Sequence, residues 1–178
     1  MNYLVISSSL NPKSRSRLLA LIVFNELKNM GVSVEWLDLA DYSIPLCDGD
    51  ATYKNTKVKK LKDKIQNAKG IFFAVPIYNY DVNAAAKNLI ELTGDAWSNK
   101  IVGFLCAAGG KASYMSVMSL ANSLMLDFRC LIIPRFVYTV SDDFTEDDIT
   151  DPKVKAQVKE LAKELIRICM VLNKYSKF

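Results

Sequence analysis

Residues 3–17 of this chain read YLVISSSLNPKSRSR, and this stretch decides how the rest of the sequence is interpreted. Its first four residues are apolar, as in a buried strand, and they run directly into a Ser-rich segment that precedes an apolar stretch with helical spacing. Short hydroxyl side chains, backbone N–H groups and the cations Lys13, Arg15 and Arg17 would then meet at the positive end of a helix dipole. We therefore expect a strand, an anion-binding loop and a helix N-terminus that together hold a phosphate group.

Length and composition favour a single domain over residues 1–178. The chain has 178 residues, of which 51% are hydrophobic, and this is enough to bury one core. No apolar run reaches the roughly 20 residues of a membrane span, and Met1 leads into a strand without a basic, cleavable leader. The four cysteines form no C-x-x-C pair and are expected to be reduced core residues: Cys47, Cys106, Cys130 and Cys169. We expect a soluble, cytoplasmic protein with no membrane partner.

The sequence contains no histidine, and its net charge is +4. The first fact excludes Ser-His-Asp and Cys-His catalysis as well as His-ligated zinc. The lysines are scattered over the expected helix surfaces, which favours a solvated exterior over a nucleic-acid-binding face. One acidic run lacks the spacing and central glycine of a calcium loop, and we interpret it as a solvated loop that ends in a cap before Pro152: Asp142, Asp143, Glu146, Asp147, Asp148 and Asp151.

Strands and helices are expected to alternate along the chain. We predict strands over residues 2–7, 33–38, 70–75, 100–106 and 128–133. We predict helices over residues 14–30, 56–68, 82–93, 112–126 and 152–174. The central strands are apolar throughout, as in parallel strands that are covered on both faces. The pattern predicts an α/β fold with a doubly wound sheet of five parallel strands and helices on both faces, with ligands bound beyond the carboxyl ends of the strands.

Two further loops are expected at the same edge of this sheet. The loop after the third strand begins with Pro76, Ile77, Tyr78, Asn79 and Tyr80, in which Pro76 would fix a turn and the tyrosines would offer flat surfaces. The loop after the fourth strand contains Gly109, Gly110 and Lys111, whose glycines would let the main chain approach a planar ligand closely. A phosphate site beside an aromatic slot suits a mononucleotide or a flavin. The alternative is that the tyrosines pack at a strand end and Lys111 faces water.

The three loops resemble those of the NADPH-dependent FMN reductase family of flavodoxin-like proteins. The family pattern runs G-S-x-R-x-x-S-x-N in the first loop and P-x-Y-N-x-S-x-P-G-x-L-K-N in the third, with a Gly-Gly loop after the fourth strand. The matching residues are Ser9, Ser14, Pro76, Tyr78, Asn79, Lys87, Asn88, Gly109 and Gly110. The chain departs from the pattern at Asn11 in place of Arg, at Ser16 in place of Asn or Thr, and at Asn83-Ala84 in place of Pro-Gly. One phosphate-binding cation is thereby lost, and Lys13, Arg15 and Arg17 are the candidates to replace it.

The resemblance implies a flavodoxin-like sheet with strand order 2-1-3-4-5 and an FMN cofactor. It implies that Ser9, Asn11, Ser14 and Ser16 hold the FMN phosphate and that residues 76–80 lie along the flavin edge. Gly109, Gly110 and Lys111 would border the pyrimidine end, where Lys111 could stabilise the charge of reduced flavin. No protein acid or base is needed, because the flavin carries the chemistry. The implied activity passes electrons from NADPH or NADH through FMN to a small acceptor such as a flavin, a quinone, an azo compound or a metal oxyanion.

Other classes with related folds fit the residues less well. A flavodoxin-type electron carrier without NAD(P)H activity is the main alternative, but its T-x-T-G-x-T loop is absent. A phosphoacceptor domain needs acidic residues where this chain has Ser7-Ser8 and Pro76, and a dinucleotide-binding fold needs G-x-G-x-x-G after the first strand.

The expected helices also bear on assembly. Met115, Met118 and Met125 are interpreted as adaptable core residues of the fourth helix. Residues 18–24 of the first helix are apolar almost all round, which exceeds what one sheet face covers and suggests a homodimer or homotetramer.

Overall fold

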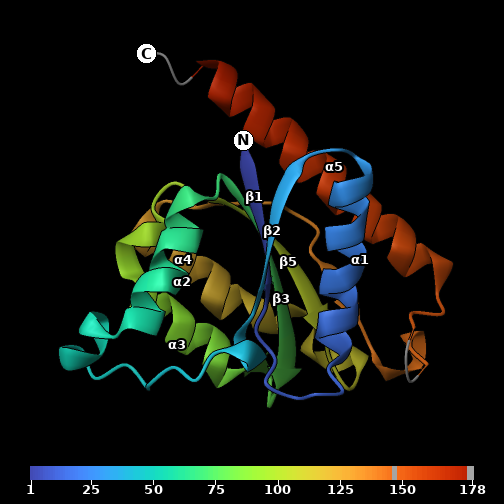
Figure 1. The fold of residues 1–178 in the computed structure, drawn as a ribbon. Coiled ribbons are helices and arrows are strands. Elements are labelled where there is room, and N and C mark those ends of the chain that lie inside the picture. Colours follow the sequence, from blue (N-terminus) through green and yellow to red (C-terminus); the bar gives the residue numbers. More distant parts are fainter. Residues whose placement is uncertain (146–147, 176–178) are drawn as a thin grey trace.

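The computed structural model describes residues 1–145 and 148–175 and contains one twisted sheet with helices on both faces (Figure 1). Five of the seven strands of the sheet form one row in the order β2-β1-β3-β5-β6, and every neighbouring pair in that row is parallel. Their bounds are β1 (Asn2–Ser7), β2 (Ser33–Asp38), β3 (Gly70–Tyr78), β5 (Ile101–Ala107) and β6 (Leu131–Ile132). This order is consistent with the predicted fold but differs slightly from the predicted strand order, because two short strands are added beside the main row. Strand β4 (Asp81–Val82) pairs with β3 in antiparallel orientation, and β7 (Val137–Thr139) pairs with β5.

The helices divide into two groups, one on each face of the sheet. The group on one face comprises α1 (Arg15–Asn29) and α5 (Pro152–Tyr175), which bury their apolar residues against one side of β1, β3 and β5. The group on the other face comprises α2 (Thr56–Asn67), α3 (Ala84–Thr93) and α4 (Met118–Phe128). Short 3₁₀ segments join these elements: η1 (Leu39–Asp41), η2 (Ala51–Lys54), η3 (Gly94–Trp97), η4 (Lys111–Val117) and η5 (Ser141–Asp143). Two apolar cores therefore sandwich the sheet, as expected for a doubly wound fold.

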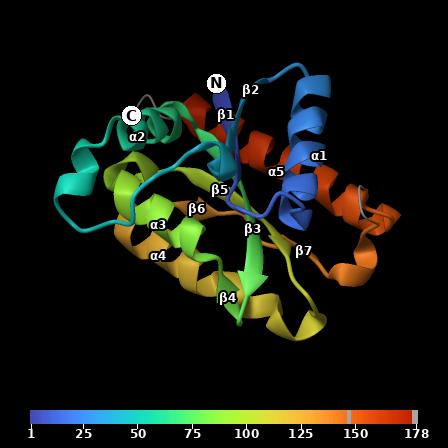
Figure 2. The same cartoon turned by 60° about the horizontal axis from the view of Figure 1, so that its bottom comes forward.

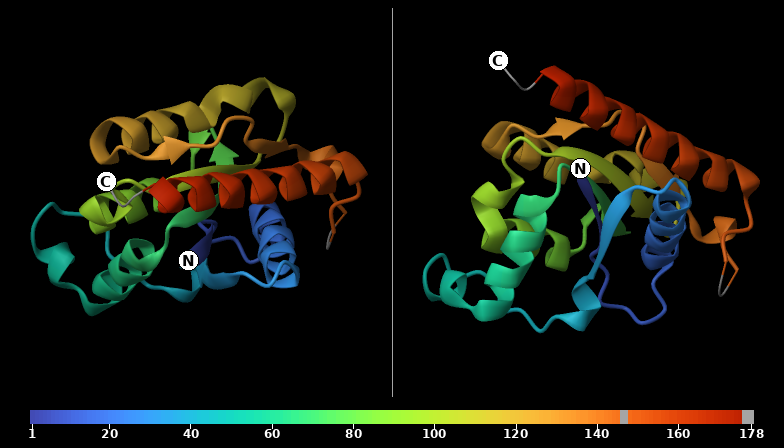
Figure 3. Two further views of the ribbon diagram at one scale, coloured as in Figure 1. Left: turned by 90° about the horizontal axis from the view of Figure 1, so that it is seen from above. Right: turned by 45° about the horizontal axis from the view of Figure 1, so that its top comes forward.

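The central strands are buried along almost their whole length. All seven residues of β5 and the first eight of β3 are buried, which confirms the prediction from their continuous apolar runs. Helix α5 packs closely against these strands at two glycines. A Cβ atom at Gly70 would lie 2.4 Å from Leu165 Cδ2, and one at Gly103 would lie 3.0 Å from Leu161 Cδ1. The last turns of α5 project beyond the start of β1 (Figures 1 and 3).

Several predicted boundaries were wrong at the far edge of the sheet. The predicted strand over residues 128–133 is the two-residue strand β6, since α4 continues to Phe128 and Arg129 ends it in the left-handed region at φ 55°. Pairing with β5 resumes at β7 (Val137–Thr139) after a break in which Arg135 has φ 58°. The predicted helix over residues 112–126 is the 3₁₀ segment η4 followed by α4.

The third strand and the helix after it also differ from prediction. Strand β3 runs through Pro76 to Tyr78, so Pro76 lies in a strand and fixes no turn. Residues 81–82 form β4, and the next helix begins at Ala84. The cap predicted before Pro152 is present, and the first helix is capped as well. Ser14 caps α1, and the Asp151 carboxylate accepts a hydrogen bond from the Lys153 N–H (2.8 Å) at the start of α5.

Other sequence expectations concern membranes, metals and cysteines. No helix in residues 1–145 and 148–175 is long and apolar enough to cross a membrane, and the same residues contain no cluster of carboxylate or thiol groups suited to a metal ion. Glu146 and Asp147 of the acidic run lie outside the described residues. The cysteines are unpaired, and all but the partly exposed Cys47 are buried.

Candidate functional site

Three loops at the carboxyl edge of the sheet enclose a cavity of about 960 Å³. They follow β1, β3 and β5, and Figure 2 shows this end of the molecule facing the viewer. Eleven of the twelve residues predicted to form the site line this cavity: Ser9, Asn11, Ser14, Ser16, Pro76, Ile77, Tyr78, Asn79, Tyr80, Gly109 and Gly110. Lys13, Arg15, Ala107, Ala108, Ala112 and Ser113 complete the wall. The structure therefore brings together three loops that are far apart in the sequence.

Lys111 is the exception among the twelve. Its exposed side chain lines a second cavity of about 940 Å³, which lies between residues 133–143 and α5. The wall of that second cavity carries the carboxylates Asp143, Glu160 and Glu164, which balance the cations Lys111, Arg135 and Lys163. The wall of the first cavity, as far as the structure describes the chain, carries no carboxylate and two cations, Lys13 and Arg15. An anionic ligand is therefore favoured in the first cavity.

The first loop ends at the capped start of α1. The Ser14 hydroxyl accepts a hydrogen bond from the Arg17 N–H (3.2 Å) and lies 3.0 Å from the Ser16 hydroxyl, and both serines are buried. The N–H groups of Arg15 and Ser16 belong to the first helical turn, which has no intrahelical acceptors. Two hydroxyls and the positive end of the helix dipole thus meet at one end of the cavity, as the sequence predicted.

The loop that precedes this helix is shaped by its own side chains. The Asn11 side chain accepts a hydrogen bond from the Lys13 N–H (2.9 Å), and Ser9 Oγ accepts one from the Asn11 N–H (3.3 Å). Asn11, which stands where the related family has an arginine, therefore forms a turn inside the loop. Its side chain supplies no positive charge to the site.

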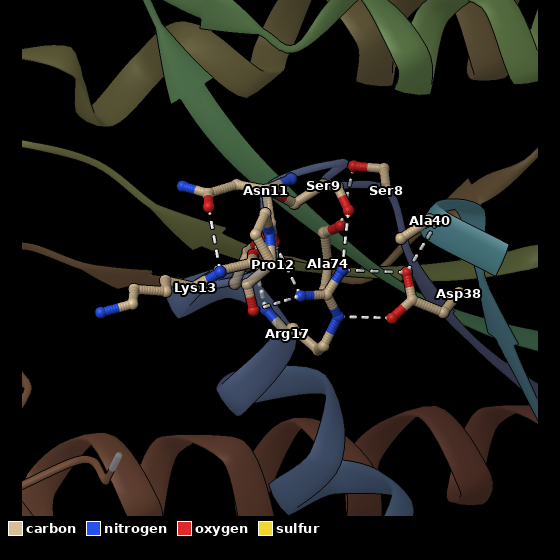
Figure 4. A network of polar contacts seen from close by, with 11 residues as sticks. Ser8, Ser9, Asn11, Pro12, Lys13, Arg17, Asp38, Ala40 and Ala74 are labelled. Carbon is tan, nitrogen blue, oxygen red and sulfur yellow. Dashed lines mark hydrogen bonds and ion pairs between the residues drawn. The ribbon is translucent and has the colours of Figure 1, made fainter. Parts of the chain in front are cut away.

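The guanidinium groups of Arg17 and Arg15 both have partners within the chain. The Arg17 guanidinium is bound to the Asp38 carboxylate and to backbone carbonyl oxygens of the loop (Figure 4). The Arg15 guanidinium donates to Ser141 Oγ (2.6 Å) and lies over the Phe144 ring at 5.7 Å from its centroid. Of the three candidates, Lys13 and Arg15 are exposed residues that line the cavity wall.

A tight hairpin between β3 and β4 forms the second wall of the cavity. Tyr78 pairs with Asp81, and the two residues between them, Asn79 and Tyr80, have φ angles of 52° and 63°. Two consecutive positive φ angles define a type I′ turn, for which asparagine is favoured at the first position. The turn presents Tyr78 and Tyr80 at the cavity with 52% and 69% of their surface exposed, so neither is a packing residue at a strand end.

A buried hydrogen-bonded link that the sequence analysis missed joins the first loop to this hairpin. The Asn83 amide nitrogen donates to the Ser8 carbonyl oxygen (2.8 Å), and Ser8 Oγ lies 2.8 Å from Asn83 Oδ1. Both residues depart from the family pattern, which has glycine and proline at these positions. The only available signal was that the two departures occur together. The link replaces a backbone kink with a side-chain contact between the two loops.

The glycine loop after β5 forms the third wall. A Cβ atom at Gly109 or Gly110 would meet no protein atom within 4 Å, and neither glycine has a positive φ. The Gly110 carbonyl accepts a hydrogen bond from the Tyr138 hydroxyl (2.5 Å). Neither the backbone conformation nor packing within the chain therefore requires glycine at these two positions. A ligand that lies against the main chain would explain why they have no side chain.

The site contains no group suited to acid-base or thiol catalysis. Its described wall lacks carboxylates and cysteines, and the sequence has no histidine. The buried cysteines are unreactive, since burial raises the pKa of Cys130 and of Cys169 to about 11 and keeps both thiols protonated. A site with an anion-binding helix start, exposed aromatic rings and an open glycine surface fits a phosphorylated planar cofactor such as FMN.

Comparison with known proteins identifies the family. Residues 1–145 match the NADPH-dependent FMN reductase family, and the chain therefore belongs to that family. Membership makes it an oxidoreductase that uses FMN and takes electrons from NAD(P)H.

Individual relatives agree with this assignment. An NAD(P)H-dependent FAD/FMN reductase from Geobacillus thermodenitrificans is 29% identical over 141 residues, which cover 77% of this chain and 76% of that protein. An NADPH azoreductase from Bacillus sp. strain OY1-2 is 24% identical and covers 93% of this chain and 90% of that protein. The fold matches that of a flavoenzyme NAD(P)H:(acceptor) oxidoreductase from Paracoccus denitrificans with a TM-score of 0.77 and 16% identity, covering 95% and 97% of the two chains.

The open glycine surface leads to a direct test. We expect Gly109→Ala or Gly110→Ala to weaken FMN binding by about tenfold, or about 1.4 kcal/mol, because a methyl group would occupy space that the ligand needs. The free energy of unfolding should stay unchanged, since that methyl group meets no protein atom. Fluorescence titration and urea denaturation measure the two quantities.

Gly70→Ala is the matched control for this test. Its Cβ would lie 2.4 Å from Leu165, so we expect a loss of stability of roughly 1–3 kcal/mol with FMN affinity retained in the folded protein. Full FMN affinity in both Gly109→Ala and Gly110→Ala would show that the ligand does not lie against this loop.

Proposed function

We propose that the cavity of about 960 Å³ is the FMN site and that the chain passes electrons from NAD(P)H through FMN to a small acceptor. The main support for this proposal is that eleven of the residues implied by the family resemblance line one cavity. The described wall of that cavity has no carboxylate. A phosphate is attracted to such a wall and a planar ring fits between its aromatic and glycine sides.

Each loop has a separate task in this proposal. The hydroxyls of Ser9, Ser14 and Ser16 and the N–H groups of the first turn of α1 hold the phosphate. Residues 76–80 lie along one ring edge, and Gly109 and Gly110 lie along the pyrimidine end. When bound, FMN supplies the two-electron redox chemistry, and the chain binds and orients it.

Reduction gives the flavin ring a negative charge, which requires a positive partner near the pyrimidine end. Lys111 remains the proposed cation for this role, although its side chain lines the neighbouring cavity. The N–H groups of Gly109 and Gly110, which line the FMN cavity, are the alternative.

The acceptor is proposed only as a class. A flavin, a quinone, an azo compound or a metal oxyanion would each reach the ring from the side of the exposed Tyr78 and Tyr80. The relative named as an azoreductase supports the azo compound among these.

The buried thiols support a cytoplasmic location, because free cysteines persist in reducing compartments.

Reduction by nicotinamide separates this enzyme from an electron carrier. We expect NADPH or NADH alone to bleach the flavin absorbance of the FMN-loaded protein under anaerobic conditions, because a reductase leaves the ring open to the nicotinamide. Stopped-flow absorbance measures the rate, with free FMN at the same concentration as the control. Failure of both nucleotides, with rapid reduction by a protein donor, would favour the flavodoxin-type carrier.

Assembly is the second proposal, and it rests on residues that were expected to be core. Met115 is 61% exposed and Met125 is 37% exposed, so the prediction that they pack in the core was wrong. Leu126 of the same helix is 85% exposed. Segment η4, which carries Met115, lies next to β4 of the hairpin. We propose that these apolar side chains are covered by a second copy in a homodimer, or in a tetramer built from it.

Light scattering tests the assembly. We expect at least twice the 20.0 kDa mass of one chain at micromolar concentration, and we expect Met115→Asp to shift the protein to the monomer. Met170→Asp on α5 is the matched control, because Met170 is 59% exposed on a different helix. A monomeric native protein would contradict the proposal.

A further inference from the structure

Arg17 makes more polar contacts than a residue that merely faces water would make. Its guanidinium donates to the carbonyl oxygens of Asn11 (2.7 Å), Pro12 (3.2 Å) and Ser9 (3.0 Å), and it pairs with the Asp38 carboxylate through Nε and Nη2. The Arg17 side chain is 17% exposed and that of Asp38 is 9% exposed. Figure 4 shows the guanidinium between the loop and the end of β2. The contact set uses the planar fork that only arginine offers.

These contacts fix the direction of the loop carbonyls. A guanidinium has donors and no acceptor, so it draws carbonyl oxygens toward itself. In a trans peptide the N–H of the next residue points away from the preceding carbonyl. The Leu10 N–H therefore points away from Arg17 when the Ser9 carbonyl points toward it. Carbonyl oxygens would repel a phosphate. Because these carbonyls point toward Arg17, they do not face the cavity and do not repel a phosphate there.

Asp38 determines what charge Arg17 can offer. The carboxylate lies at the last residue of β2 and also accepts a hydrogen bond from the Ala40 N–H (3.0 Å), so its position is fixed from two sides. The Arg17 guanidinium and the Asp38 carboxylate together have almost no net charge. The guanidinium is bound on the side of the loop toward which the carbonyl oxygens point. A direct phosphate contact by Arg17 would require it to give up this pair.

We propose that Arg17 and Asp38 are positioning residues for the FMN phosphate, which shape the loop over residues 9–13 without touching the ligand. The proposal rests on the FMN site of the preceding section. It explains how the loop can bind a phosphate although Asn11 replaces the family arginine. The anion is held by oriented N–H and hydroxyl groups, and the arginine acts from the other side of the loop.

The direction in which Asp38→Asn changes FMN affinity distinguishes a positioning role of Arg17 from direct electrostatic binding of the phosphate. Asp38→Asn removes a negative charge near the phosphate and releases Arg17 from its pair. If Arg17 acted as a phosphate cation, this change would strengthen FMN binding. If Arg17 positions the loop, Asp38→Asn loosens the hold of the guanidinium on the loop carbonyl oxygens. The carbonyls are then free to turn, and FMN binding weakens.

The experiment measures the dissociation constants of FMN and riboflavin by fluorescence titration for the native protein, Asp38→Asn and Arg17→Lys. Riboflavin lacks the phosphate, so a loosened phosphate loop lowers FMN affinity and leaves riboflavin affinity within about threefold. We expect a loss of FMN affinity of about tenfold or more in both variants, or about 1.4 kcal/mol. Arg17→Lys keeps the charge but loses the fork, so a lysine should not restore binding.

Lys64→Gln is the matched control, because Lys64 joins α2 to Glu35 of β2 by an ion pair at 2.8 Å without contacting the loop. It should leave both affinities unchanged. Equal or tighter FMN binding by Asp38→Asn, or full FMN affinity in Arg17→Lys, would overturn the positioning role. A parallel loss of FMN and riboflavin affinity would also overturn it, since that result indicates general loosening. A native protein that binds FMN and riboflavin equally would instead contradict the proposed FMN site. If Arg17→Lys does not fold, the isosteric Asp38→Asn carries the test alone.

Discussion

The parallel pairing of β1 with both β2 and β3 is the constraint on which the site depends. In this register Ser7 lies opposite Asp38 on one side and Ala74 on the other, so three strands reach the same edge together. The Ser8 N–H continues the pairing by donating to the Ala74 carbonyl (3.0 Å). The first loop therefore starts at the level from which Asp38 can meet Arg17, and beside the hairpin that Asn83 ties to Ser8. A shift of one residue in this pairing would separate all of these partners.

The composition of the cavity explains why a cofactor must carry the reaction. Hydroxyls, N–H groups, two cations, tyrosine rings and glycines line the described wall, and no carboxylate, histidine or thiol is among them. Binding and orientation are tasks that such a wall can perform. The same lack of acidic groups distinguishes this cavity from its neighbour of nearly equal volume, which contains Asp143, Glu160 and Glu164. Electrostatics, and not size, therefore separates the two.

The sequence predicted the elements whose signals are local and strong. Continuous apolar runs identified β3 and β5, and Asp151 marked the start of a helix, because caps and burial patterns act over a few residues. The type I′ turn was missed, because Asn79 is followed by tyrosine where glycine is usual.

Features that depend on partners distant in the sequence were also missed. The Arg17 contact with Asp38 spans 21 residues, and the Ser8 contact with Asn83 spans 75. Met115 and Met125 were misassigned, because helical spacing alone does not reveal which apolar side chains of a helix stay exposed.

The location of the phosphate is the central claim, and the crystal structure of the FMN complex tests it most directly. The account predicts phosphate oxygens within hydrogen-bonding distance of the hydroxyls of Ser14 and Ser16, with the ring between the β3–β4 hairpin and Gly109-Gly110. The Arg17 guanidinium should still be bound to Asp38 in that complex. A phosphate in the cavity lined by Phe136 and Lys163, or one bound directly by Arg17, would contradict the account.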